Sequence, residues 1–424
     1  MMEAGLGGLK RKAHEIRWIL FFFTVFFLIQ FYQSAFPSWD NIVYLYQGKW
    51  FCGEQIYFEW LRPPLPGAIN CILGASAIST ILSGALSSLL YLAAVTLLYF
   101  KEKREQDIDQ IAYAGLSFIV PTILFLSNAG GDMFALSFLL FALLAENPFL
   151  KGAAFSLATL SRYNYLFFLP LLLIQLNPKK LARFALALPA FWLPWIAYNY
   201  FATGNPFFSV GESIYLNIGQ KGILAGLQPY QIAIIAFFSL TLYLSRHDKK
   251  TKIAGLINIA AAISVVQFVL SGIKEHRFLN PLAPAQSLNI ANAQGSRGKN
   301  AIYPLLALFM AFNIAMLLWI GTPMPPAIPE DDLISQCQVM SDQWVYFYPR
   351  GINAQPLGGK DSFMQALEEG KILVIYDKTL LEGANFEGYE TWKREKYTII
   401  KKAATCKGPE QKYSLKIGEN QAEG

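Results

Sequence analysis

The chain has 424 residues, of which 54% are hydrophobic and only 15% are charged, and its formal net charge is +6. Soluble globular proteins are about 45–50% apolar and about 25% charged, so this composition excludes an ordinary soluble protein for most of the chain. The basic residues stand in short segments between long apolar runs, which is typical of membrane proteins and not of nucleic-acid-binding proteins. Four Cys and three His are too few and too scattered for a metal-cluster motif.

The first apolar run, residues 17–36, follows the basic residues Lys10, Arg11 and Lys12. It has no small-residue cleavage site, so it predicts an uncleaved signal anchor. A membrane helix needs about 20 apolar residues, or fewer where the segment is broken or re-entrant. Further runs bring the expected total to about 11 membrane helices; they are 79–100, 110–127, 132–146, 152–161, 163–176, 182–202, 229–245, 253–271, 279–294 and 301–320. The two short runs, 152–161 and 163–176, predict half-length helices that meet at Ser161 and Arg162.

The basic residues also predict the orientation in the membrane. If residues 1–16 are a cytoplasmic tail, the cytoplasmic segments carry 17 Lys and Arg residues, and the outer segments carry 6. Lys and Arg concentrate in cytoplasmic loops, so this orientation is favoured over its inverse. It makes residues 37–66 the first outer loop and places the chain after Thr322 on the outer side.

The C-terminal region has the composition of a soluble domain. Residues 17–320 form the expected membrane domain, the Pro-rich stretch 321–330 is a stiff linker, and residues 331–424 predict a small extracytoplasmic α/β domain. Strands are expected at Trp344–Tyr348, Lys371–Asp377, Tyr397–Ile400 and Tyr413–Ile417, and helices at Ser362–Glu369 and Tyr389–Lys396.

The cysteines leave the disulfide pairing open. Cys337 and Cys406 lie in the outer domain, where oxidation occurs, and they form either a disulfide or two free thiols. Cys52 and Cys71 lie nearer the membrane and are not assigned a partner, because four Cys allow three full pairings.

Polar residues at membrane depth are costly, so they are candidates for function. Most of them fall at the outer ends of the apolar runs; they are Asp40, Glu54, Glu59, Arg62, Asp132, Arg162, Lys274, Glu275, His276 and Arg277. Such a mixture suits a reaction on a phosphate-bearing substrate at the outer leaflet. A carboxylate can take a proton from a nucleophilic hydroxyl, while Arg and Lys can hold a phosphate leaving group.

Each candidate also has a purely structural interpretation. Asp40 and Asp132 are each placed where they can be helix N-caps, and Arg62 before two prolines can be a snorkelling residue in a rigid turn. Arg162 interrupts an apolar run, so it must face an aqueous cavity or an ionic partner such as Asp132. The cluster from Lys274 to Arg277 is either a solvated loop or a contact with a headgroup or phosphate.

Taken in order, these motifs resemble the GT-C superfamily of membrane glycosyltransferases, which use polyprenyl-phosphate sugars as donors. The motifs that carry the resemblance are Asp40 after the first run, Arg62-Pro63-Pro64-Leu65, Asp132, Ser161-Arg162-Tyr163 before a run ending in Leu169-Pro170, and Lys274-Glu275-His276-Arg277-Phe278 followed by Pro281 and Pro284. The last motif is similar to a Lys-Glu-x-Arg-Phe-x-x-Pro signature of dolichyl-phosphate-mannose-dependent mannosyltransferases. The stretch Tyr200–Pro206 resembles an outer loop of the protein O-mannosyltransferase-like branch. The resemblance covers residues 15–320.

The chain also departs from the family pattern. Many relatives have Asp-Glu in the first outer loop, whereas this chain has Asp40-Asn41. The departure leaves open whether a second acid is needed and whether Glu54 or Glu59 supplies it. No WWD-like motif is present, and Gln343-Trp344-Val345 is only a distant echo of one, so transfer of a whole oligosaccharide is disfavoured.

The resemblance implies an inverting hexosyltransferase that moves a monosaccharide, with mannose favoured, to a hydroxyl of a glycan, lipid or protein acceptor at the outer membrane face. It implies Asp40 as general base, Asp132 as an orienting acid, and a donor-phosphate site of Arg162, Lys274 and Arg277, with Arg62 and His276 as weaker members. A divalent metal is compatible with this chemistry, but no ligand spacing requires one.

Two other functional classes remain as alternatives. A transporter or flippase for lipid-linked sugars needs polar groups near the bilayer midplane and usually an inverted repeat, and no convincing repeat is evident. A non-catalytic GT-C relative that serves as a receptor or an assembly subunit is the second alternative.

Overall fold

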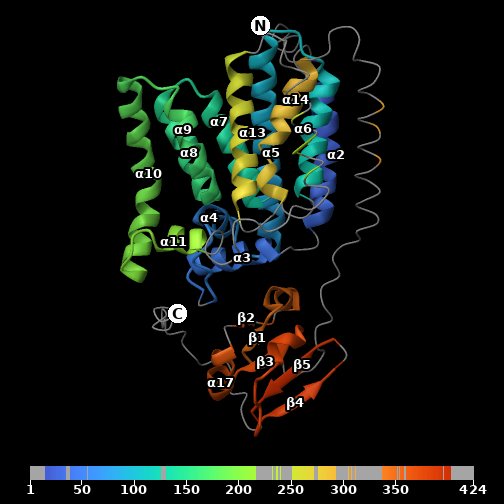
Figure 1. Ribbon diagram of the computed structural model, residues 1–424, viewed down its shortest axis with the longest axis vertical. Coiled ribbons are helices and arrows are strands. Elements are labelled where there is room, and N and C mark those ends of the chain that lie inside the picture. The colour runs from blue at the N-terminus through green and yellow to red at the C-terminus, as the bar shows by residue number, and fades with distance from the viewer. Residues whose placement is uncertain are drawn as a thin grey trace.

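The computed structural model describes residues 15–34, 39–54, 56–125, 130–215, 251–271, 276–292, 337–350, 354–357, 360–394 and 396–402, together with a few isolated residues. A helical bundle comes first in the chain, and a small sheet-containing region follows it at one end of the bundle (Figure 1). Apolar membrane segments become helices because a helix satisfies its own backbone hydrogen bonds where no water is present.

Most of the predicted apolar runs correspond to helices of the bundle. They are α2 (Arg17–Ser34), α5 (Ala77–Lys103), α6 (Gln110–Phe125), α7 (Gly130–Leu144), α8 (Pro148–Ser161), α10 (Pro178–Thr203), α13 (Lys252–Leu270) and α14 (Leu282–Asn292). Polar caps define several of their starts: Asn147 accepts the Phe149 N–H at 2.9 Å, and Asn177 accepts the Lys180 N–H at 2.9 Å. Gly204, with a φ of 75°, ends α10 in the left-handed conformation that favours glycine.

Only some of the 11 predicted membrane helices lie within the described residues. Three described helices are long and apolar enough to cross a membrane, namely α5, α10 and α13, and shorter apolar helices accompany them. The predicted break at Ser161 and Arg162 is present, because α8 ends at Ser161 and the 3-10 helix η1 (Tyr163–Phe168) begins one residue after Arg162 and leads into α9 (Leu169–Leu173). Residues 1–14 of the predicted tail 1–16, the linker 321–330 and almost all of the runs 229–245 and 301–320 lie outside the described residues.

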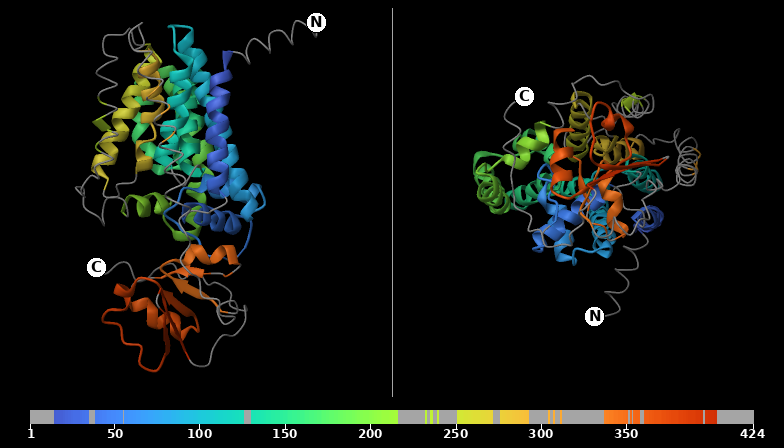
Figure 2. Two further views of the ribbon diagram at one scale, coloured as in Figure 1. Left: turned by 90° about the vertical axis from the view of Figure 1, so that its right-hand side faces the viewer. Right: turned by 90° about the horizontal axis from the view of Figure 1, so that it is seen from below.

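Three short helices lie at the end of the bundle that faces the sheet (Figures 1 and 2). They are α3 (Trp39–Phe51), α4 (Pro64–Ile72) and α11 (Phe208–Ile214). We call this end of the molecule the α3 end. At the other end, Lys151 Nζ donates to the Ala142 carbonyl at 2.7 Å and to Gln175 Oε1 at 3.1 Å, which ties the start of α8 to its neighbours.

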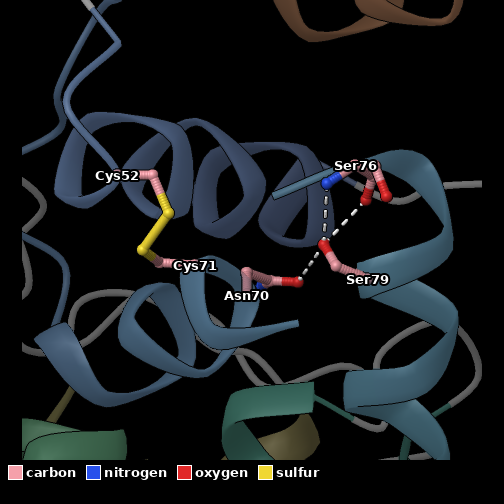
Figure 3. The surroundings of a disulfide bond; sticks show 5 residues. All are labelled: Cys52, Asn70, Cys71, Ser76 and Ser79. Atoms are coloured by element: carbon pink, nitrogen blue, oxygen red, sulfur yellow. Dashed lines mark hydrogen bonds between the residues drawn. A yellow bond between two sulfur atoms is a disulfide. The ribbon is translucent and has the colours of Figure 1, made fainter. Parts of the chain in front are cut away.

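A disulfide joins Cys52, just after α3, to Cys71 near the end of α4 (Figure 3). Beside it, Ser79 Oγ lies 3.0 Å from Asn70 Oδ1 and accepts the Ser76 N–H at 3.1 Å, which links α4 to the start of α5. The sequence analysis left this pairing open. Cys337 is also disulfide-bonded, whereas Cys406, its expected partner, lies outside the described residues.

Removing this bridge is expected to lower stability. The two cysteines are separated by 19 positions, and closing a loop of this size stabilises a protein by about 3 kcal/mol. We expect the double variant Cys52→Ser, Cys71→Ser to lose stability of this order in a denaturant or thermal unfolding experiment. A double variant that unfolds like the wild type would show that closure of this loop contributes nothing.

The C-terminal region contains a mixed five-stranded sheet in the order β2-β1-β3-β5-β4. Its strands are β1 (Val339–Ser341), β2 (Ala354–Pro356), β3 (Ile372–Ile375), β4 (Glu390–Lys393) and β5 (Thr398–Lys401). Strand β1 runs parallel to β2 and β3, whereas β5 runs antiparallel to β3 and β4. Helix α17 (Lys360–Glu368) packs on one face of the sheet through Phe363 and Leu367.

Two predicted elements of this region are wrong. Trp344–Tyr348 is not a strand but the start of the 3-10 helix η5 (Trp344–Arg350), and its aromatic residues serve tertiary packing. Tyr389–Lys396 is not a helix, because Glu390–Lys393 forms β4 against β5. The predicted strands at 371–377 and 397–400 and the helix at 362–369 are present, while Tyr413–Ile417 lies outside the described residues.

Candidate active site

Asp40 lies in the first turn of α3 and is surrounded by three arginines. Arg62 Nη1 lies 2.9 Å from Asp40 Oδ1, and Arg162 Nη2 donates to Asp40 Oδ2 at 2.7 Å. Arg277 Nη1 also donates to Asp40 Oδ2. Because Asp40 is only 5% exposed, its carboxylate is compensated by these partners rather than by water.

A second buried carboxylate, Asp132, belongs to the same cluster. It lies in the first turn of α7, where it accepts a hydrogen bond from Arg162 Nη2 at 2.6 Å and lies 3.7 Å from Arg277 Nη1. Gly131 allows the start of α7 to pack closely against α3 and α4, because a Cβ at that position would lie 3.0 Å from Tyr44 Oη and 3.3 Å from Pro66. Asp40 is the second residue of α3 and Asp132 the third residue of α7, so neither is at the N-cap position, and both bind guanidinium groups across the fold.

The break between α8 and η1 positions Arg162. Its backbone leaves the helical conformation with φ −155° and ψ 115°, and the side chain is buried at the α3 end of the bundle. Its neighbour Tyr163 is held by Trp195, whose Nε1 donates to Tyr163 Oη at 2.7 Å. The half-length helices thus bring a cation from the middle of the sequence to the two acids.

Glu59 completes the charge balance. Its Oε2 accepts a hydrogen bond from Arg62 Nε at 2.8 Å, so Arg62 bridges Glu59 and Asp40. Three carboxylates (Asp40, Glu59, Asp132) therefore face three guanidinium groups (Arg62, Arg162, Arg277), and the cluster as a whole is neutral. An anion can bind to these arginines by replacing one of the carboxylates as their partner. Its binding therefore does not require a positive pocket without compensating charges.

Burial and charge act in opposite directions on Asp40, which lies in α3 and outside the long apolar helices. Burial alone raises the pKa of its carboxyl, but the charges of Arg62, Arg277 and Arg162 more than offset burial and hold this pKa well below its usual value. The carboxylate is therefore ionised at neutral pH.

This pKa shift predicts how stability depends on pH. An acid whose pKa is lower in the folded state stabilises the fold above its unfolded pKa, about 3.9 for Asp, and this contribution disappears as the pH falls through the folded-state pKa. We expect the difference in thermal midpoint between the wild type and Asp40→Asn to be constant from about pH 8 to pH 5 and to shrink only below about pH 4. A difference that shrinks between pH 7 and pH 5 would mean that the pKa is raised.

Several buried donors around Arg162 have no hydrogen-bond partner among the described residues. They are the hydroxyls of Tyr44 and Tyr165 and the Nε of Arg162 itself. The guanidinium carbon of Arg162 lies 5.8 Å from the centre of the Tyr44 ring, and the Tyr165 N–H donates to the Arg162 carbonyl at 3.0 Å. Buried donors are nearly always satisfied, so this side of Arg162 is suited to a ligand with acceptor oxygens.

Tyr44 gives a direct test of that suggestion. Because its hydroxyl has no partner in the described part of the protein, Tyr44→Phe is expected to leave the unfolding temperature unchanged or slightly raised. The same variant is expected to lower kcat/KM about 10–100-fold, since a hydrogen bond to a charged ligand contributes about 1.5–3 kcal/mol. Paired unfolding and steady-state measurements check both parts, and a loss of stability without loss of activity would contradict the ligand role.

The structure does not bring all predicted site residues together. Glu54 is half exposed and pairs with Lys49 at 2.9 Å, away from the cluster, so of the two candidate second acids only Glu59 lies within it. Lys274 and Glu275 lie outside the described residues, and for His276 only the backbone, at the start of the 3-10 helix η4 (His276–Leu279), is described. Among the described residues, no group of three or more His, Cys, Asp or Glu side chains is arranged to hold a metal ion.

The sequence analysis missed Tyr44 and Tyr165. Both lie in stretches rich in aromatic residues, where the sequence does not distinguish a tyrosine that faces the site from one that faces lipid. The position of Tyr44 one helical turn after Asp40 was an available signal, because residues four apart share a helix face.

No protein-family model matches the chain, and no curated protein matches its sequence. Two crystal structures of ArnT from Cupriavidus metallidurans are similar in fold. The one bound to undecaprenyl phosphate has a TM-score of 0.61 at 13% identity and covers 93% of this chain and 99% of its own. The apo structure has a TM-score of 0.58 at 13% identity, and the match covers 91% of this chain and 98% of the ArnT chain. The chain therefore shares the ArnT fold over nearly its whole length.

Proposed function

We propose that this protein is a membrane glycosyltransferase of the GT-C type that takes its sugar from a polyprenyl-phosphate donor. The observation that carries the proposal is the buried cluster in which Asp40 and Asp132 share Arg162 and Arg277 at one end of the bundle. Guanidinium groups suit a phosphate in both the donor and the leaving group. A carboxylate beside them suits the removal of a proton from an acceptor hydroxyl.

The proposed reaction is a single displacement with inversion. The acceptor oxygen attacks the anomeric carbon, its proton passes to Asp40, and the bond between the anomeric carbon and the phosphate oxygen breaks. The leaving group departs as a polyprenyl phosphate, whose additional negative charge is stabilised by Arg162 and Arg277. Lys274, Arg62 and His276 are proposed as further phosphate ligands. Asp132 holds Arg162 and orients the acceptor, and Glu59 holds Arg62.

The fold supports the lipid-linked donor. ArnT, a glycosyltransferase of the GT-C superfamily, shares this fold, and one of its structures contains undecaprenyl phosphate. Both fold and charge pattern are thus compatible with a polyprenyl-phosphate donor here. Mannose as the sugar, and a hexosyltransferase activity, rest on the resemblance of Lys274–Phe278 to the mannosyltransferase signature. The acceptor is proposed as a hydroxyl of a glycan, a lipid or a protein.

The proposed orientation places the α3 end outside the cytoplasm. The excess of Lys and Arg in the segments assigned to the cytoplasm supports it. The start of α5 and the end of α13 lie at the α3 end, so the ion cluster and the C-terminal sheet are both proposed to face the outer side.

Transport of a lipid-linked sugar is the competing function. It is less well supported, because transporters place their polar groups at the midplane of the membrane, whereas the cluster of Asp40, Asp132 and Arg162 forms at the α3 end. A non-catalytic role is less well supported as well, since such a role gives no reason to keep two buried acids among three arginines.

The experiment that tests the proposal uses the purified full-length protein in lipid vesicles. A panel of polyprenyl-phosphate monosaccharides is supplied with lipid, glycan and peptide acceptors, and release of polyprenyl phosphate and transfer of the labelled sugar are followed. We expect both products to appear together with at least one donor, with mannose as the first candidate. Movement of the intact donor across the bilayer without cleavage would identify a transporter, and no turnover with any donor would overturn the proposal.

A further inference from the structure

Helix α3 contacts the arginine cluster on one side and the C-terminal sheet on another. Asp40 and Tyr44 lie toward the arginine cluster, whereas Ile42, Val43 and Tyr46 pack into a hydrophobic cluster with the C-terminal sheet. With 13 residues, α3 is at the lower limit of what forms a stable helix alone in water. Its position therefore depends on packing from both sides.

The face of the sheet that meets α3 is apolar. Alternate residues of a strand point to opposite faces, and in β3 Leu373 and Ile375 pack with α17, whereas Ile372 and Val374 belong to the cluster with α3. In Figure 2 the orange chain of η5 lies between the sheet and α3. The C-terminal domain thus has a face that is covered by the membrane domain.

Trp344 occupies the centre of this contact. It is 1% exposed, and its ring centre lies 5.7 Å from Trp39, 5.2 Å from Tyr46 and 5.1 Å from Tyr57. These distances are typical of favourable aromatic pairs. Trp39 directly precedes Asp40, and Tyr57 lies two residues before Glu59, which binds Arg62. A single indole therefore contacts both the helix that carries Asp40 and the segment that leads to Glu59 and Arg62.

The sheet holds Trp344 in place. Asp342 accepts the Tyr376 N–H at 3.0 Å and the Asp377 N–H at 2.8 Å, which ties the turn before Trp344 to the end of β3. The Gln343 N–H is bound by Ser341 Oγ at 3.0 Å. The indole thus takes its position from the adjacent strands β1 and β3.

We infer that Trp344 is a positioning residue for Asp40. Through Trp344, the C-terminal domain contributes to the geometry of the active site. The inference rests on the proposed function. A displacement of a reacting group by about 1 Å can reduce the rate about 10²-fold. Arg162 and Arg277, the proposed phosphate ligands, belong to elements of the bundle, so a shift of α3 affects proton removal more than donor binding.

The test compares Trp344→Ala, Trp344→Phe and Phe363→Ala in the full-length protein. Phe363 is equally buried in the same domain but lies on the opposite face of the sheet, so its variant controls for general destabilisation of the domain. We expect Trp344→Ala to lower kcat about 10–100-fold with the KM for the donor within about threefold, and Trp344→Phe to recover most of kcat. Hydrogen exchange of residues 39–51 should rise in Trp344→Ala and not in Phe363→Ala.

The outcomes separate this inference from the proposed function. An inactive wild type would overturn the proposed function, while hydrogen exchange would still report whether Trp344 holds α3. An active wild type with equal kcat in Trp344→Ala and wild type would overturn the inference alone. Equal losses of kcat in Trp344→Ala and Phe363→Ala would also overturn it, because both losses would then reflect the stability of the domain.

Discussion

Replacing Asp40 by Asn is expected to lower kcat for sugar transfer by about 10²–10⁴-fold, the range for loss of a general base. The amide keeps the size of the side chain but cannot accept the acceptor proton. It also leaves Arg62, Arg162 and Arg277 with one negative charge fewer. Donor affinity is therefore expected to stay the same or to increase. Steady-state kinetics with a donor-binding titration measures both effects.

Asp342→Asn is a matched control for the donor affinity of Asp40→Asn but not for its kcat, because Asp342 holds the turn before Trp344, the residue proposed to position Asp40. Asp342 is a carboxylate that binds backbone N–H groups of the C-terminal domain and lies outside the arginine cluster. Its variant is expected to lower the unfolding temperature while donor affinity remains unchanged. Full transfer activity in Asp40→Asn would remove this residue from the proposed mechanism.

Removing Arg162 is expected to have the largest combined effect on stability and function. Its guanidinium compensates two buried carboxylates, Asp40 and Asp132, and loss of one partner of a buried ion pair costs about 3–5 kcal/mol. We expect Arg162→Gln to lose stability of this order and to lose donor binding, as measured by thermal unfolding and by a binding titration.

Neutralising Asp132, the acid that loses its partner, separates the effect on stability from the effect on donor binding. In Arg162→Gln, Asp132→Asn the uncompensated carboxylate is gone, so part of the stability should return, with a coupling of about 0.5–3 kcal/mol. Donor binding should stay low, because the phosphate ligand is still missing. Lys151→Met serves as a control, since Lys151 is a buried cation at the other end of the bundle. If donor binding returns in the double variant, Arg162 has only a structural role.

The charged part of the site could be predicted from the sequence because charge at membrane depth is costly. Asp40, Asp132, Arg162 and Arg277 interrupt or end apolar runs, and the alternation of the runs places them all at one end of the bundle. The exact pairing could not be predicted, because it depends on how the break at Arg162 and the first outer loop meet in space. Glu54 and Glu59 looked equivalent in sequence, and only Glu59 lies within reach of Arg62.

The C-terminal domain shows where local patterns mislead. Trp344–Tyr348 is rich in strand-forming residues, yet it forms η5 because its side chains fill the contact with α3. Glu390–Lys393 has charged ends typical of a helix, but Thr391 and Trp392 pair with β5. In both cases tertiary contacts outweigh local propensity. The apolar run beginning at Ile372 was predictable because β3 is buried on both faces.

In the proposed mechanism a lipid-linked phosphate binds to the arginines in place of Asp40. Titration of the purified protein with a polyprenyl phosphate, with Arg277→Gln and Asp40→Asn compared, tests this exchange. We expect opposite effects: weaker binding in Arg277→Gln, which loses a phosphate ligand, and equal or tighter binding in Asp40→Asn, which loses the competing carboxylate. Equal affinities in wild type, Arg277→Gln and Asp40→Asn would contradict it, because the phosphate would then bind elsewhere.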